Sequence, residues 1–245
     1  MDSAPLDRMQ LRLETIYEVD LADRVVDFLI TDPDVACVLD TSVNARQSRE
    51  KLLVQEDGDD LRVGLYLDRD VVDRLQRDDP SRGLHNENLD TFCLAMEGVS
   101  HFLYVAYNAK YERAVSLMEL ELQAEVDKYV CIASLLNEQG QGYKDRRLRT
   151  WLFEDVSYDK ELDAHQLYRY QQANSYAARY CEWLSCQYPD RRRNCDMLNE
   201  LRRFYRKFSF NRILVIRQLL DQQRWNYPAY TALSPSVFNI FSIIF

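Results

Sequence analysis

The sequence predicts an α+β fold that is predominantly helical, with a small N-terminal antiparallel sheet followed by a bundle-like helical part. Two patterns predict this fold. Apolar and polar residues alternate over residues 61–67, as in a strand, whereas apolar residues recur at helical spacing from about residue 86 onward. Glycine and proline are scarce, six each among 245 residues, which argues against a β protein rich in repeats and turns.

The N-terminal part is predicted to combine short helices with a small sheet. The acidic stretch 56–60, which contains Gly58, predicts a hairpin turn between two apolar runs. The run Asp32-Pro33-Asp34 is expected to end the first helix. We expect helices over 14–31 and 70–77, a short strand over 35–39, and hairpin strands over 51–55 and 61–67.

The remainder of the chain is predicted to be helical up to an uncharged tail. Gly140 and Gly142 are expected to end one long helix, and Pro189 another. We expect helices over 86–108, 112–138, 162–187, 194–207 and 210–224. The resulting division is 1–82 as an α+β part, 83–224 as a helical part and 225–245 as an apolar tail, folding together as one cooperative unit.

Composition and the N-terminal residues bear on location and partners. The first dozen residues contain no apolar run, and no segment reaches the roughly 18 apolar residues of a membrane span. The six cysteines form no CxxC pair, so we expect reduced thiols and a cytoplasmic protein without a membrane span. The uncharged tail 225–245 is expected to contact another protein or a second copy of the chain.

The most informative feature is a polar stripe on a helix that should be buried. Asp90, Glu97, His101 and Asn108 fall within about 40° of one another on a helical wheel, and the rest of the helix is mostly apolar. A carboxylate and an imidazole inside a packed core need polar partners or a chemical role. The stripe therefore marks the first place to look for a site.

The next helix is expected to bring further carboxylates to the same place. The link between the two helices is short and polar, which favours antiparallel packing. In that arrangement His101 lies opposite residues 119–121, and Glu97 lies opposite residues 123–125. The sequence thus predicts a cluster of Glu97, His101, Glu121 and Glu125 between the two helices.

Three interpretations of this cluster remain open. Carboxylates and imidazole in a helical bundle can bind a divalent metal ion, although the Glu-x-x-His motif of di-metal bundles is missing. Glu97 beside His101 can also serve as a catalytic acid–base pair. Alternatively, the cluster is a structural network completed by basic side chains of other helices. The candidate partners are Lys128, Arg169 and Arg179.

A second candidate is a basic cluster in the C-terminal third. Residues 144–224 hold 17 Lys and Arg against 11 Asp and Glu, while the rest of the chain holds 14 against 29. Such a cluster can bind an anion or nucleic acid, or pair with the protein's own acidic half. Its members are Arg191, Arg192, Arg193, Arg202, Arg203, Arg206 and Lys207.

Motifs of well-known enzyme classes are missing from the sequence. It contains no P-loop, no GxGxxG, no GxSxG and no HExxH. This favours a non-catalytic interaction or regulatory protein. A metal-assisted or acid–base enzyme using the carboxylate–histidine cluster is the first alternative, and nucleic-acid or anion binding through residues 191–217 is the second.

Overall fold

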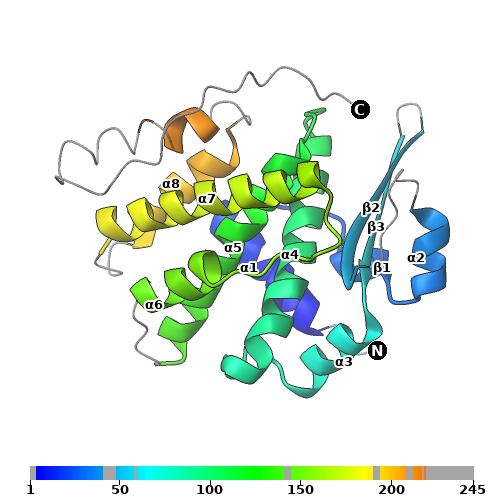
Figure 1. The fold of residues 1–245 in the computed structure, drawn as a ribbon, viewed down its shortest axis with the longest axis horizontal. Coiled ribbons are helices and arrows are strands. Elements are labelled where there is room, and N and C mark those ends of the chain that lie inside the picture. The colour runs from blue at the N-terminus through cyan, green and yellow to red at the C-terminus, as the bar shows by residue number, and fades with distance from the viewer. Residues whose placement is uncertain are drawn as a thin grey trace.

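The computed structural model describes residues 4–40, 48–57, 60–140, 145–189, 194–207, 212–216 and 218. It is predominantly helical with a small sheet near the N-terminus, which confirms the predicted fold class (Figure 1). The predicted tail over 225–245 lies outside the described residues, as does Arg191-Arg192-Arg193.

The first helix lies earlier in the chain than predicted. Helix α1 spans Ala4–Tyr17, whereas 14–31 was expected to be helical. Glu18 has a φ of 50°, a left-handed conformation that ends the helix. The chain then forms a 3₁₀ turn, η1 (Val25–Phe28), and a two-residue strand, β1 (Leu29–Ile30).

The predicted strand over 35–39 is wrong, because these residues belong to helix α2 (Pro33–Leu39). The Asp32 side chain accepts a hydrogen bond from the Asp34 amide, and Pro33 occupies the first turn, where its missing N–H costs nothing. The same Asp-Pro-Asp run that was expected to stop a helix therefore starts one.

The predicted hairpin is confirmed as β2 (Glu50–Asp57) and β3 (Asp60–Leu67), which pair antiparallel from Glu50–Leu67 to Asp57–Asp60. The third strand is β1, which pairs parallel with β3. The sheet is therefore mixed, with the order β1-β3-β2, rather than purely antiparallel. The predicted short helix follows as α3 (Arg69–Arg77).

The three long helices lie close to their predicted positions. Helix α4 is Asn86–Ala109, α5 is Leu117–Glu138 and α7 is Ala164–Gln187. Helix α5 begins later than the predicted residue 112, since Ser116 and Glu119 form a capping box there. Two short elements before α7 were not predicted: α6 (Asp145–Arg149) and the π-helical turn η2 (Thr150–Glu154).

Helix α4 occupies the centre of the molecule. It contacts β2 and β3 on one side and α5 on the other, and α7 packs across α5 (Figure 1). Helix α8 (Asn194–Tyr205) packs against α1, and residues 212–216 are also helical. A buried polar side chain on α4 therefore faces the sheet or another helix.

The two predicted parts share one hydrophobic core. Buried residues of a single cluster come from the N-terminal elements and from the later helices alike, for example Leu13, Leu65, Val99, Ile132 and Ala177. Among the described residues, no helix combines the length and apolarity that crossing a membrane requires.

Candidate metal centre

The polar stripe of α4 divides into buried and exposed positions. Asp90 is exposed near the start of the helix, whereas His101 and Asn108 are buried and Glu97 is half-buried. Asn108 is satisfied locally, because its side-chain amide donates to the Tyr104 carbonyl oxygen at 2.8 Å. The part of the stripe that needs partners from other elements is therefore Glu97 and His101.

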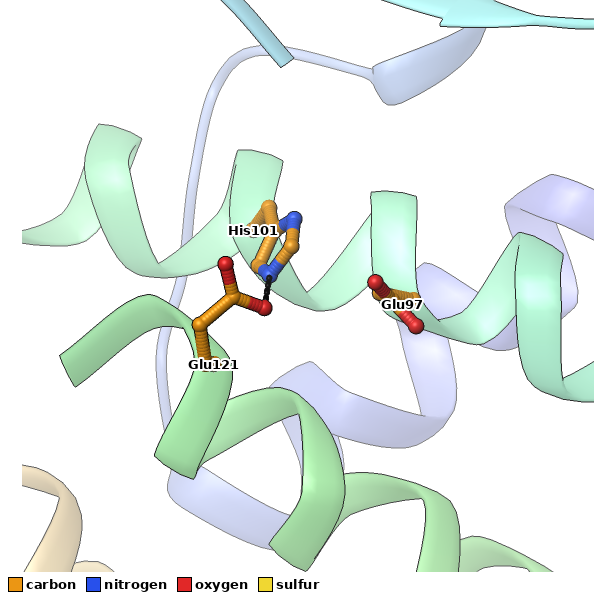
Figure 2. A group of neighbouring side chains, drawn as sticks. All are labelled: Glu97, His101 and Glu121. Atoms are coloured by element: carbon orange, nitrogen blue, oxygen red, sulfur yellow. Dashed lines mark ion pairs between the residues drawn. The ribbon is translucent and has the colours of Figure 1, made fainter. Parts of the chain in front are cut away.

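Glu97 and His101 meet Glu121 of α5, as the antiparallel packing predicts (Figure 2). Each of the three side chains offers a ligand atom, and all three atoms lie within 4.8 Å of one another. His101 Nε2 lies 3.8 Å from Glu121 Oε2. The His101 side chain is only 8% exposed, and its Nε2 makes no hydrogen bond within the described structure. This buried nitrogen thus lies near the Glu121 carboxylate without a hydrogen bond to it.

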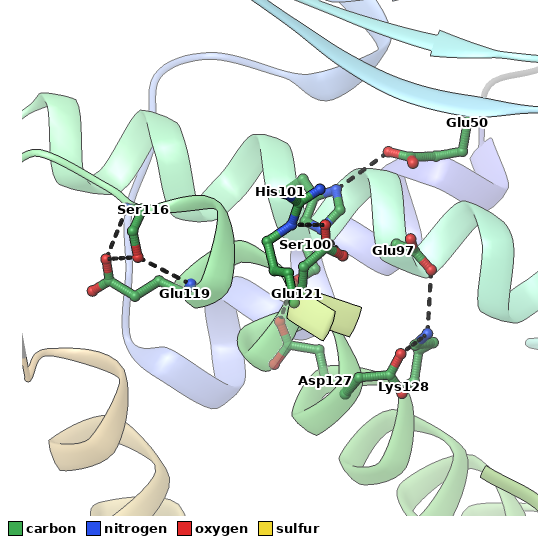
Figure 3. A network of polar contacts seen from close by, with 11 residues as sticks. Glu50, Glu97, Ser100, His101, Ser116, Glu119, Glu121, Asp127 and Lys128 are labelled. Atoms are coloured by element: carbon green, nitrogen blue, oxygen red, sulfur yellow. Dashed lines mark hydrogen bonds and ion pairs between the residues drawn. The ribbon is translucent and has the colours of Figure 1, made fainter. Parts of the chain in front are cut away.

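The other ring nitrogen of His101 is held from the sheet. Its Nδ1 lies 3.4 Å from Oε1 of Glu50, the first residue of β2 (Figure 3). A histidine that binds a metal ion through one nitrogen usually donates its other N–H to a carboxylate or a carbonyl oxygen. Glu50 and His101 have this arrangement, with Nε2 left facing the carboxylate cluster.

Gly98 allows the sheet to come this close to α4. A Cβ atom at position 98 would lie 2.8 Å from Leu65 Cδ1 and 3.2 Å from both Cγ and Oε1 of Glu50. A glycine inside a helix costs about 1 kcal/mol relative to alanine. The close approach of β2 and β3 explains why a glycine fits here, and it brings Glu50 to His101.

Glu125, the fourth predicted ligand, has a different partner. Lys128 Nζ lies 2.6 Å from Glu125 Oε1 and 3.2 Å from Glu97 Oε2. Glu125 therefore belongs to the same polar region but lies outside the group of three ligand atoms. Glu97 links the two, because it contributes to that group and also accepts a hydrogen bond from Lys128.

Helix α7 adds groups beside the cluster. Arg169 Nε lies 3.6 Å from Glu121 Oε1, while Arg179, the other predicted partner on this helix, is exposed. Tyr170 is half-buried, and burial together with the negative charges of Glu121 and Glu97 raises the pKa of its hydroxyl. The cluster is thus bordered by α4, α5, α7 and the sheet.

Burial, together with an excess of carboxylates over basic groups, shifts the pKa values of the cluster residues. Burial favours neutral His101, but the hydrogen bond to Glu50 and the charges of Glu50, Glu121 and Glu97 outweigh it and raise the His101 pKa to about 9. Burial raises the pKa of Glu121 to about 7, although His101 and Arg169 counteract it. Burial also opposes ionisation of Glu97, but Lys128 and His101 lower its pKa overall. The cluster therefore retains protons at neutral pH.

The count of charges explains this retention. Four carboxylates, those of Glu50, Glu97, Glu121 and Glu125, face two permanently charged bases, Lys128 and Arg169. Within the described part of the chain, ionising all four leaves two negative charges without a permanent cation, in a region with little water. Either protons or a divalent cation can supply the missing positive charge.

A second polar network lies on another face of the α4–α5 pair (Figure 3). Ser100 Oγ donates to Asp127 Oδ2 at 2.6 Å, and Tyr17 and Gln123 donate to Asp127 Oδ1. Arg212 also bonds Gln123, although it comes from the segment after α8. Burial raises the pKa of Asp127 to about 6. Its carboxylate is satisfied by three donors, so this network is structural.

The described part of the basic cluster makes intramolecular contacts. Arg202 Nε donates to the Ile16 carbonyl oxygen at 2.9 Å and Arg206 to that of Tyr17 at 2.8 Å, so both satisfy the last turn of α1. Arg203 pairs with Glu200 within α8. The fourth described member, Lys207, is half-buried two residues after the end of α8.

Sequence reasoning missed Glu50, Tyr170 and the Asp127 network. The sequence held only a weak signal for Glu50. This residue starts a strand in which Leu52, two residues later, points to the same face. Nothing in the spacing connects Tyr170 or Arg212 to the α4–α5 pair.

Comparison with known proteins adds no relative of this chain. No protein-family model, curated protein or solved structure matches it.

Proposed function

We propose that this protein binds one divalent metal ion through Glu97, His101 and Glu121. The supporting observations are that three ligand atoms lie within 4.8 Å of one another, and that His101 Nε2, 3.8 Å from Glu121 Oε2, is buried without a hydrogen-bond partner in the described structure. Ligand atoms of one ion are about 3 Å apart at metal–ligand distances near 2.1 Å. Small side-chain rotations would bring the carboxylates to that separation.

The donor set favours Mn²⁺, Fe²⁺ or Zn²⁺. Carboxylate oxygens alone suit Mg²⁺ and Ca²⁺, whereas imidazole suits Zn²⁺ and Fe²⁺, and a mixed set suits ions between these classes. A divalent ion would also supply the two positive charges that the four carboxylates lack. Three protein ligands leave coordination positions for water, which is typical of catalytic metal sites.

The test is metal binding by the purified protein and by matched variants. We expect the metal-free wild type to take up one equivalent of Mn²⁺ or Zn²⁺ in a calorimetric titration. His101→Gln and Glu97→Gln should lose this binding. Asp90→Asn removes an exposed acid from the same helix and should bind as the wild type does. Circular dichroism establishes that each variant is folded.

Two results would contradict the proposal. One is a wild type that binds neither ion at micromolar concentrations. The other is a pair of folded variants, His101→Gln and Glu97→Gln, that bind as tightly as the wild type. Either result would leave the cluster as a structural ion network.

A second candidate function, contact with another protein, is favoured by helix α2. Val35, Val38 and Leu39 recur at helical spacing and are 45%, 82% and 48% exposed. Among the described residues, strand β2 lies at the edge of the sheet, with β3 as its one neighbouring strand. We propose that the exposed residues of α2 and the free edge of β2 associate with a second copy of the chain. Sedimentation of the wild type should show a dimer that Val38→Glu weakens, and a monomeric wild type at high concentration would refute it.

A further inference from the structure

Lys128 occupies an unusual position for a lysine. Its side chain is only 10% exposed, and its ammonium lies 3.2 Å from Oε2 of Glu97 (Figure 3). The same ammonium lies 2.6 Å from Oε1 of Glu125. A lysine is rarely buried unless its charge is paired. Here two carboxylates from two different helices surround it.

The spacing along the helices places this ammonium directly beside the candidate metal position. On α4, Glu97 and His101 are four residues apart, and on α5, Glu121, Glu125 and Lys128 follow one another at intervals of four and three. The antiparallel pair therefore places these side chains at two successive levels along the helix axes. His101 faces Glu121 at one level, and Glu97 faces Glu125 and Lys128 at the next.

Glu97 belongs to both levels. It offers a ligand atom to the group with His101 and Glu121, and one of its oxygens also accepts from Lys128. A carboxylate shared by two neighbouring cations is the feature that joins the two ions of dinuclear metal sites, which lie about 3.5–4 Å apart. In this chain the second cation is an ammonium group supplied by the protein.

We propose that Lys128 fills the second cation position of a two-cation carboxylate site and so limits the protein to one metal ion. This inference rests on the proposed metal-binding function. It makes Lys128 the residue that determines stoichiometry: Glu125, freed from the lysine, would join Glu97 as a ligand for a second ion of the same class. A lysine that served only for packing would have no influence on how many ions bind.

The experiment compares Mn²⁺ binding by the wild type, Lys128→Ser and the control Lys110→Ser, which removes an exposed lysine. Calorimetry gives the stoichiometry, and electron paramagnetic resonance tells an isolated Mn²⁺ from two Mn²⁺ ions in exchange contact. We expect one isolated ion in the wild type and in Lys110→Ser. Lys128→Ser should bind two ions with a coupled signal, and adding Glu125→Gln should return it to one.

The outcomes separate this inference from the proposed function. A wild type that binds no Mn²⁺ or Zn²⁺ refutes both. A wild type that binds one ion, together with a folded Lys128→Ser that still binds one, refutes the role of Lys128 alone. If Lys128→Ser does not fold, Lys128→Gln replaces it. A wild type that binds two ions in excess Mn²⁺ also overturns the inference, without any variant.

Discussion

Raising the pH should destabilise the metal-free protein through His101. The pKa of this residue is about 9 in the folded protein, against an ordinary value of 6.5. Because folding raises this pKa, the protonated imidazole stabilises the native state fully below pH 6.5. That contribution is lost as the pH rises through 9. The responsible charges face His101 from three elements: Glu50 on β2, Glu97 on α4 and Glu121 on α5.

The size of the effect follows from the two pKa values. A difference of about 2.5 between them corresponds to roughly 3 kcal/mol of unfolding free energy, most of it lost between pH 7 and pH 9. Glu121, with a pKa of about 7, acts in the same direction but mainly below pH 7. The pKa of the half-buried Cys93 thiol is about 12, so it does not titrate in this range.

The assay is urea unfolding at pH 7, 8 and 9 in the presence of a chelator. The wild type should lose stability across this range, and His101→Gln should lose much less, since it has no proton to release. His165→Gln removes an exposed histidine and should behave as the wild type does. Equal slopes for wild type and His101→Gln would refute the reasoning, whatever the absolute stability of the variant.

Three further predictions concern the same region. Glu50→Gln should weaken metal binding by about 10–100-fold, because His101 loses the carboxylate that orients it, and calorimetry should show an unchanged stoichiometry; equal affinity would contradict the role of Glu50. Gly98→Ala should lower the free energy of unfolding by about 1 kcal/mol, since crowding against Leu65 and Glu50 exceeds the gain in helix propensity. A variant that is more stable in urea unfolding would show that the sheet shifts away from the added methyl group at no cost. Metal binding at pH 7.5 should release about one proton from His101, so the titration enthalpy should change with the ionisation enthalpy of the buffer, and identical enthalpies in two buffers would exclude this exchange.

The sequence was most informative where interactions are local. The three long helices were predictable because apolar periodicity persists over more than 20 residues in each. The facing of His101 and Glu121 followed from a short link between two such helices. The N-terminal errors arose where one signal has two meanings: Asp32-Pro33-Asp34 can end a helix or begin one, and five apolar residues suit a strand or a helix equally.

The remaining site residues were not predictable because tertiary contacts determine them. Glu50 is 51 residues from His101 in the chain, and only the packing of the sheet on Gly98 brings them together. Arg169 was one of three candidate basic partners in the sequence, and only the packing of α7 shows that it is the one that reaches Glu121 from that helix. A buried polar stripe on one helix can therefore reveal that a site exists, but the elements that complete it depend on how the sheet and α7 pack.

A structural ion network and a metal site differ in how a rise in pH affects the protein: it lowers the stability of the network, whereas it raises the affinity of the site for metal. In a purely structural network, the proton on His101 holds Glu50 and Glu121 together, so stability falls as the pH rises from 7 to 9. At a metal site the same proton competes with the ion for Nε2, so affinity rises over this range. Saturating metal then stabilises the native state more at pH 9 than at pH 7. Unfolding curves at both pH values, with and without Mn²⁺, therefore distinguish the interpretations: parallel losses of stability indicate a network, and a gap that widens with pH indicates a metal centre.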